Sequence, residues 1–170
     1  FDDINLDVMY ALPGQTLDEA RRDIETATSF GTVHLSAYHL TIEPNTYFHR
    51  YPPRLPEDDL AADMQQMIED TLSARGYRNY ETSAFATPGR ECRHNLNDWR
   101  FGDYLGIGAG AHGKISLPDR VLREARVKHP REYLEAVGRG THIEAAHDVS
   151  HRELPFEFMM NALRLTEGFR

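Results

Sequence analysis

The sequence predicts an α/β fold, and three features of its first 40 residues indicate this. Residues 4–12 (INLDVMYAL) alternate apolar and polar side chains, which is the period of a β-strand. Residues 17–29 carry apolar side chains at helical spacing, and residues 33–40 (VHLSAYHL) form a second short strand. A strand, a helix and a strand in this order predict a βαβ unit with a parallel pair of strands.

Local signals mark the ends of these elements. Pro13-Gly14 is a turn signal that ends the first strand. Thr16 then caps the helix, and Glu19 completes a capping box because its carboxylate can reach back to the backbone of Thr16. Residues 42–56 hold four prolines and predict a long loop, which at such a position is more often functional than accidental.

The rest of the chain predicts further helices and strands. Residues 57–76 predict a helix with acids in its first turn and Gly76 as its stop. Residues 77–85 predict one strand. Beyond them we expect two antiparallel strands, KISL and RVLREARV, joined at Pro118-Asp119, then a short helix at 130–140, a linker at 141–150 and a new helix from 151 to 170.

Charge and cysteine content exclude several classes of protein. The net charge of −8 argues against a general nucleic-acid binder, which needs clustered Lys and Arg. No apolar run reaches membrane-spanning length. The single cysteine, Cys92, excludes an internal disulfide and an all-cysteine metal site, and a reducing cytosol is the simplest setting. The chain starts at Phe1 and stops inside an apolar pattern, so we expect a piece of a longer protein.

The glycine-rich segment at residues 92–114 invites a phosphate-loop interpretation, which its surroundings disfavour. Gly108 to Lys114 matches the start of a P-loop, but Ile115 replaces the Ser or Thr that holds Mg²⁺. A turn at Pro118 leaves no room for the helix that would present its N-terminus to phosphate, which also defeats the G-x-G-x-x-G interpretation. Two alternatives remain: glycines that permit a bend and close packing in a strand, or a backbone wall for a flat ligand.

Histidines near this segment could bind metal, but none forms a zinc site. Cys92 and His94 could share one face of a strand, yet two ligands make no structural zinc site. His147 and His151 lie in a polar stretch and read as solvated surface. His94, which lies near Trp99, is either an ordinary loop histidine or an axial ligand to a planar metal macrocycle.

Asp7 is the most unusual residue of the first strand. A carboxylate in an apolar parallel strand is costly without a partner. In a β/α barrel, the face opposite Ile4, Leu6 and Val8 points into the lumen, and ligands bind near the carboxyl ends of the strands. Asp7 would then suit the hydroxyl pair of a ribose, the alternative being a buried Asp bonded to nearby backbone.

Four stretches together resemble one family. NLDVMYALPGQTLDEARRDIE, HLSAYHLTIEPNTYF, YETSAFATPGRECRHNLNDWRFGDYLGIGAGAHGK and PFEFMMNALRL are similar to the radical S-adenosylmethionine proteins of the oxygen-independent coproporphyrinogen III oxidase group, and most similar to its haem-chaperone branch. The resemblance implies the later part of a partial (β/α)6 barrel over residues 1–140 with closing antiparallel strands. It also implies a linker at 141–150 and the truncated first helix of a small C-terminal domain at 151–170.

The resemblance also implies cofactors and site residues. It implies S-adenosylmethionine, held by Asp7, and a [4Fe–4S] cluster whose CxxxCxxC motif nothing in this sequence matches. His94 and Asn95 match the start of the family's haem-associated block, His-Asn-x-x-Tyr-Trp, in which Asp98 here replaces the Tyr. Gly108, Gly110 and His112 match a strand that closes the barrel and forms a wall for the cofactor.

We therefore expect a cytoplasmic haem chaperone that binds haem or porphyrin and delivers haem to haem-requiring proteins, with no nucleic-acid partner and no transmembrane segment. One alternative is an oxidase that decarboxylates coproporphyrinogen III to protoporphyrinogen IX by radical chemistry, so whether the protein is an enzyme stays open. Another alternative is a small-molecule-binding α/β module without radical chemistry.

Overall fold

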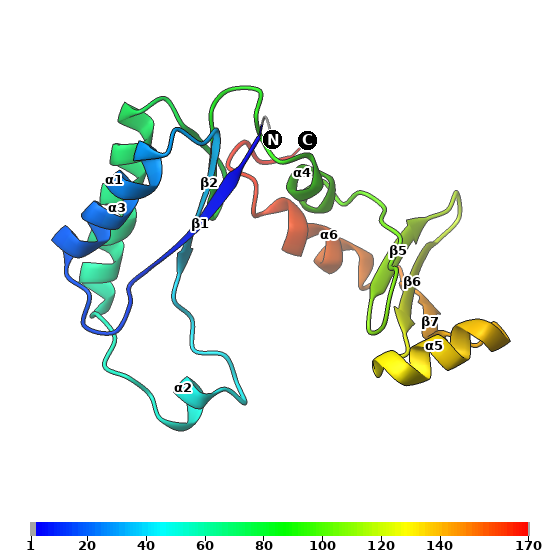
Figure 1. Cartoon of the computed structure of the whole chain (residues 1–170). Coiled ribbons are helices and arrows are strands. Elements are labelled where there is room, and N and C mark those ends of the chain that lie inside the picture. Colours follow the sequence, from blue (N-terminus) through cyan, green and yellow to red (C-terminus); the bar gives the residue numbers. More distant parts are fainter. Residues whose placement is uncertain (1–2, 170) are drawn as a thin grey trace. The chain divides into compact units, whose positions relative to one another are not determined.

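A computed structural model describes residues 3–169 of the chain (Figure 1). The chain forms two compact units. The first unit contains residues 1–92 and the second contains residues 93–170. Each unit has its own sheet. Among residues 3–169, no helix combines the length and apolar character that crossing a membrane requires.

The first unit is a four-stranded sheet with two long helices packed on one face (Figure 1). Its strands lie in the order β1-β2-β4-β3. β1 and β2 pair in parallel, as the sequence predicts for a βαβ unit, and the other two pairings are antiparallel. The elements are β1 (Asn5–Tyr10), α1 (Leu17–Ser29), β2 (His34–His39), α2 (Tyr47–Arg50), α3 (Asp58–Ala74), β3 (Arg78–Glu81) and β4 (Ala84–Ala86).

The helix α1 begins where the sequence predicts. The Thr16 hydroxyl accepts the backbone N–H of Glu19, and the Glu19 carboxylate accepts the backbone N–H of Thr16 at 2.9 Å. This capping box satisfies two N–H groups that have no partner inside the helix. The stop at Gly76 is also confirmed, because its φ of 85° is a conformation that glycine adopts without strain.

The core of the first unit lies between the sheet and the two helices. Leu6 and Val8 pack against it from β1, and Leu35 and Phe85 are buried within it from β2 and β4. These positions alternate along their strands, so the polar residues between them face the other side of the sheet. The helices contribute Ala20, Ile24 and Ala27 from α1 and Met64, Met67, Ile68 and Leu72 from α3.

The second unit contains a three-stranded antiparallel sheet. Along the chain, one helix precedes its strands, one lies between the second and third strands, and one follows them. The strands lie in the order β5-β6-β7. β5 and β6 form the hairpin that the sequence predicts around Pro118-Asp119, where the Leu117 N–H donates to the Arg120 carbonyl at 2.8 Å. The elements are α4 (Arg93–Trp99), β5 (His112–Ser116), β6 (Val121–Arg126), α5 (Pro130–Arg139), β7 (Ile143–Asp148) and α6 (Leu154–Ala162).

Three sequence predictions of local structure need correction. Residues 77–85 form two antiparallel strands, β3 and β4, because the chain turns at Thr82-Ser83. The loop at 42–56 contains the short helix α2, capped by Thr46. The expected linker at 141–150 contains β7, which pairs with β6 along its length. The two compact units divide after residue 92. The domain boundaries at 140 and 150 stay a prediction.

Candidate functional site

Asp7 lies on the face of the first unit's sheet that points away from α1 and α3. Its neighbours Leu6 and Val8 pack toward the helices, so strand alternation turns Asp7 to the opposite side. The residue is exposed, which excludes the alternative of a buried Asp bonded to backbone. Its Oδ1 accepts a hydrogen bond of 2.8 Å from the side-chain amide of Asn5, two residues earlier on the same face.

Asn5 connects Asp7 to a row of buried polar side chains. In the parallel pairing of β1 with β2, Asn5 lies opposite His34 and Asp7 lies opposite Ser36. The Asn5 Oδ1 is 2.7 Å from His34 Nδ1 and accepts from the Ser36 hydroxyl at 3.1 Å. Tyr80 continues the row, with its hydroxyl 2.8 Å from His34 Nε2. We call Asn5, Asp7, His34, Ser36 and Tyr80 the polar row.

The polar row is buried at one end and open at the other. His34 is 6% exposed and Ser36 is 3% exposed, whereas Asp7 is exposed. Burial lowers the pKa of His34 below its ordinary 6.5, because desolvation disfavours the charged ring. The negative charges of Glu81, Asp7 and Glu91 oppose this shift. The ring is therefore best described as a neutral imidazole at pH 7.

The glycine-rich segment at 92–114 contains the helix α4, then a stretch without regular structure that turns at 108–110, and it ends in β5. Gly108 and Gly110 precede β5 and have φ values of 106° and 70°, which favour glycine. A Cβ on Gly106 would lie 2.2 Å from the His112 carbonyl oxygen, so this glycine permits close backbone packing. The expectation that Gly108 and Gly110 lie in a strand is wrong. His112 is the first residue of β5 and is exposed.

No phosphate loop forms at Lys114. The residue belongs to β5, and a hairpin rather than a helix follows it. Its ammonium, 1% exposed, donates to the Phe101 carbonyl and to Asp103 and Ser116 at 2.9–3.0 Å. With three donors and three acceptors, the ammonium has no capacity left for a phosphate.

His94 and Asn95 lie on the helix α4, so the arrangement of Cys92 and His94 on one strand does not occur. The His94 side chain is 79% exposed, and its Nε2 is 3.4 Å from the Asp98 carboxylate one turn further on. Asp98 is the residue that stands in the tyrosine position of the haem-associated block. The replacement therefore gives the His94 ring an acidic neighbour.

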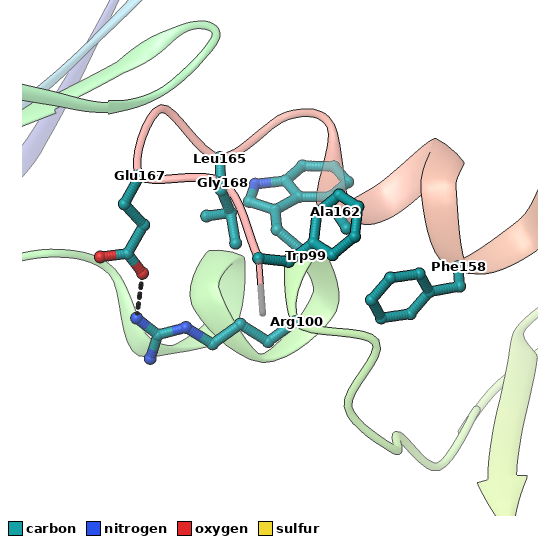
Figure 2. A pocket seen from close by; sticks show the side chains of 8 residues that line it. Trp99, Arg100, Phe158, Ala162, Leu165, Glu167 and Gly168 are labelled. Atoms are coloured by element: carbon teal, nitrogen blue, oxygen red, sulfur yellow. Dashed lines mark hydrogen bonds and ion pairs between the residues drawn. The ribbon is translucent and has the colours of Figure 1, made fainter.

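Trp99 lines a hollow of the second unit with a volume of about 520 Å³ (Figure 2). The guanidinium of Arg164 lies 4.3 Å from the centre of the Trp99 ring. Arg100 and Glu167 form an ion pair of 2.7 Å at this hollow. The other lining residues are Phe158, Ala162, Leu165, Gly168 and Phe169.

The structure brings some predicted site residues together and separates others. His94 is not among the residues that line the Trp99 hollow. His94 and Trp99 are five residues apart on α4, so their side chains point about 140° away from each other around the helix axis. Asp7 belongs to the first unit, and the other predicted residues belong to the second. Among residues 3–169, no group of three or more His, Cys, Asp or Glu could hold a metal ion.

Sequence reasoning missed the partners of Asp7. Strand alternation predicts that Asn5 shares a face with Asp7, but it does not identify His34, Ser36 and Tyr80 as site residues. The usable signal was the parallel βαβ pairing, because it places alternate residues of β2 beside alternate residues of β1 on one face. Tyr80 gave no such signal, since its position depends on the unpredicted hairpin of β3 and β4.

Curated relatives match nearly the whole chain. A protein named "Heme chaperone HemW" from Escherichia coli (strain K12) is 51% identical over 165 residues, which is 96% of this chain and 43% of that protein. Proteins of the same name are 48% identical in Haemophilus influenzae, with 96% and 42% covered, and 37% identical in Bacillus subtilis, with 99% and 45% covered. The chain thus spans less than half the length of these relatives. No family model matches it.

One solved structure has the same fold. It is described as "Coproporphyrinogen III oxidase (HemN) from Escherichia coli is a Radical SAM enzyme", and it matches 95% of this chain and 40% of its own chain with a TM-score of 0.72. At 18% identity this likeness concerns the fold alone, and it agrees with the mixed α/β architecture that the sequence predicts. By sequence, the chain is a homologue of the proteins named heme chaperone HemW and corresponds to a segment of them.

Proposed function

We propose that this chain forms part of a haem chaperone, a protein that binds haem as cargo and passes it to haem-requiring proteins in the cytoplasm. The names of the curated relatives support this, as does the His94 side chain, 79% exposed on α4. An exposed imidazole can reach the iron of a planar macrocycle without opening the protein core. That exposure is the single observation that carries the proposal.

The environment of His94 also suits an iron ligand. Asp98 lies 3.4 Å from Nε2, and a carboxylate there favours the tautomer with its proton on Nε2, which leaves the Nδ1 lone pair for a metal. We therefore assign Nδ1 to the iron. Trp99 supplies an aromatic wall to the neighbouring hollow, where an apolar macrocycle edge or a side chain of a receiving protein would find Phe158 and Leu165.

The residues of this chain can contact S-adenosylmethionine, but they cannot hold a [4Fe–4S] cluster. The Asp7 carboxylate is exposed beside Asn5 on the open face of the sheet, and its lone pairs suit the hydroxyl pair of a ribose. In the proposal, Asp7 binds and orients this sugar. The cluster has no counterpart here, since one cysteine cannot replace a motif of three, and we derive no step from it.

Replacing His94 tests the haem proposal. We expect His94→Ala in the protein at the length of its curated relatives to weaken haem binding at least about tenfold and to shift its absorbance, because an axial ligand is lost. Haem titration followed by absorbance measures both effects. His151→Ala, which removes another exposed histidine of the second unit, is the matched control and should leave both unchanged. Equal affinity of the His94→Ala and unsubstituted proteins would remove His94 from the proposed function.

A further inference from the structure

The hydrogen bonds of the polar row have directions that its chemistry determines. A carboxylate only accepts, so the atom of Asn5 that faces Asp7 Oδ1 at 2.8 Å must be the amide nitrogen. The amide oxygen of Asn5 then faces His34 and Ser36, and the hydroxyl of Ser36 donates to it. Because that oxygen only accepts, His34 Nδ1 must carry the proton.

The same logic extends to Tyr80. A neutral imidazole with its proton on Nδ1 leaves Nε2 as an acceptor. The Tyr80 hydroxyl, 2.8 Å away, therefore donates to Nε2. Its oxygen in turn accepts the backbone N–H of Cys92 at 3.4 Å. The donors run in one direction, from the partly buried backbone of Cys92 to the exposed carboxylate of Asp7.

This order matters because the last member is the one that the solvent reaches. An exposed aspartate on a strand ordinarily samples several rotamers, and each contact with a ligand must overcome that loss of freedom. Here Asn5 holds Asp7 Oδ1, and two buried side chains, His34 and Ser36, hold Asn5. A carboxylate accepts about four hydrogen bonds, so lone pairs on both oxygens stay available for two hydroxyl donors.

We propose that Asn5, held by His34, Ser36 and Tyr80, is a positioning residue that fixes the Asp7 carboxylate to receive a ligand with two vicinal hydroxyl groups. The inference rests on the proposed function, which gives Asp7 a ribose, and it deepens that function by adding the residues that orient the carboxylate. The polar row then supplies preorganisation rather than contact, since only Asp7 touches the ligand.

Two measurements on Asn5→Ala test the inference. The first is titration of the protein, at the length of its curated relatives, with S-adenosylmethionine and with its 2′,3′-dideoxy analogue. We expect Asn5→Ala to weaken binding of the diol ligand about tenfold, because a hydrogen bond to a charged group is lost, and to change binding of the dideoxy analogue little. Met9→Ala, on the same strand and face but outside the polar row, is the matched control.

The second measurement is ¹⁵N NMR of the His34 ring in this chain. We expect the Nδ1–H tautomer in the unsubstituted chain and a shift toward Nε2–H in Asn5→Ala. Asn5→Asp distinguishes the contact of residue 5 with His34 from its contact with Asp7. It keeps an oxygen for His34 Nδ1 but replaces the donor to Asp7, so the tautomer should persist while affinity for the diol ligand falls.

The outcomes separate this inference from the proposed function. Absence of S-adenosylmethionine binding in the unsubstituted protein overturns the inference and the assignment of that ligand to Asp7, while the haem proposal is tested separately at His94. Binding that Asn5→Ala weakens no more than Met9→Ala overturns the inference alone. Equal losses for the diol ligand and the dideoxy analogue also overturn it, because they indicate general damage to the sheet rather than loss of orientation.

Discussion

Lys114 illustrates how a single residue can mimic a motif and serve another purpose. Its position after a run of glycines matches a phosphate loop, but its ammonium is buried and donates to Phe101, Asp103 and Ser116. The Phe101 ring also lies 3.9 Å from the ammonium. Three acceptors and an aromatic face offset the cost of burying the charge. The lysine therefore joins β5 to the segment before it.

The carboxylate of Asp103 makes this junction sensitive to acid. Hydrogen bonds from Ser116 and Lys114 lower the pKa of Asp103 from 3.8 to about 2. Because the folded pKa lies below the unfolded one, the stabilisation is complete above pH 3.8 and is lost as pH falls through about 2. We expect Asp103→Asn to lower the free energy of unfolding by about 1 kcal/mol at pH 7, since the side chain is partly exposed.

Chemical denaturation of both proteins across pH measures this effect. The difference between the unsubstituted chain and Asp103→Asn should shrink between pH 4 and pH 2, where the native carboxylate also becomes neutral. Asp119→Asn removes a carboxylate whose ion-pair partner is the exposed Arg120, and it should show no comparable trend. A pH-independent difference for Asp103→Asn would contradict the assignment.

At the scale of the element, glycine packing decides whether β5 can form where it does. Gly106 is buried, and a Cβ there would lie 2.2 Å from the backbone oxygen of His112. Backbone atoms cannot rotate away as a side chain can, so we expect Gly106→Ala to cost about 1–3 kcal/mol. Urea denaturation of the chain measures the loss.

Gly138 provides the matched control for this prediction. It lies in the last turn of α5, where nothing lies within 4 Å of an added Cβ. Alanine has the higher helix propensity, so Gly138→Ala should stabilise the chain by about 0.5–1 kcal/mol. A Gly106→Ala chain as stable as the unsubstituted one would refute the close-packing explanation.

The elements that sequence predicted well are those with a local chemical signal. α1 begins after Thr16 as predicted, because a capping box and an apolar stripe both lie within its own residues. β7 escaped prediction because its side chains are all exposed, so it lacks the alternation that a buried face imposes. It exists through backbone pairing with β6, which no local pattern encodes.

In the candidate site too, the features that were predictable from the sequence are those with a local signal. The face of Asp7 was predictable from the alternation of its own strand. The role of His34 was not, because it requires the register that places His34 beside Asn5 and the hairpin that brings Tyr80 to Nε2. α4 was missed because a helix of about two turns, composed mostly of polar residues, carries little periodicity.

At the scale of the whole molecule, the proposed binding functions are divided between the two compact units. The first unit contains the polar row, and the second contains His94 and the Trp99 hollow. Each feature depends on packing within its own unit. We therefore expect substitutions in the polar row and on α4 to act additively on stability.

The cluster is the part of the proposed cofactor set that this chain cannot build alone. The resemblance implies a [4Fe–4S] cluster held by three cysteines, and this chain has only Cys92, a partly buried free thiol at the end of the first unit. We expect the 170-residue chain, incubated anaerobically with iron, sulfide and a reducing thiol, to retain no stable brown cluster and to bind S-adenosylmethionine poorly, since the proposed cofactor set would then be incomplete.

Absorbance and iron content per chain after gel filtration measure cluster assembly. The same treatment of the protein at the length of its curated relatives should give a brown [4Fe–4S] species, and Cys92→Ser in that protein should leave the species intact because Cys92 is not one of the three motif cysteines. A stable cluster on the 170-residue chain would contradict the proposal, since its ligands would then have to include side chains that the described structure does not bring together.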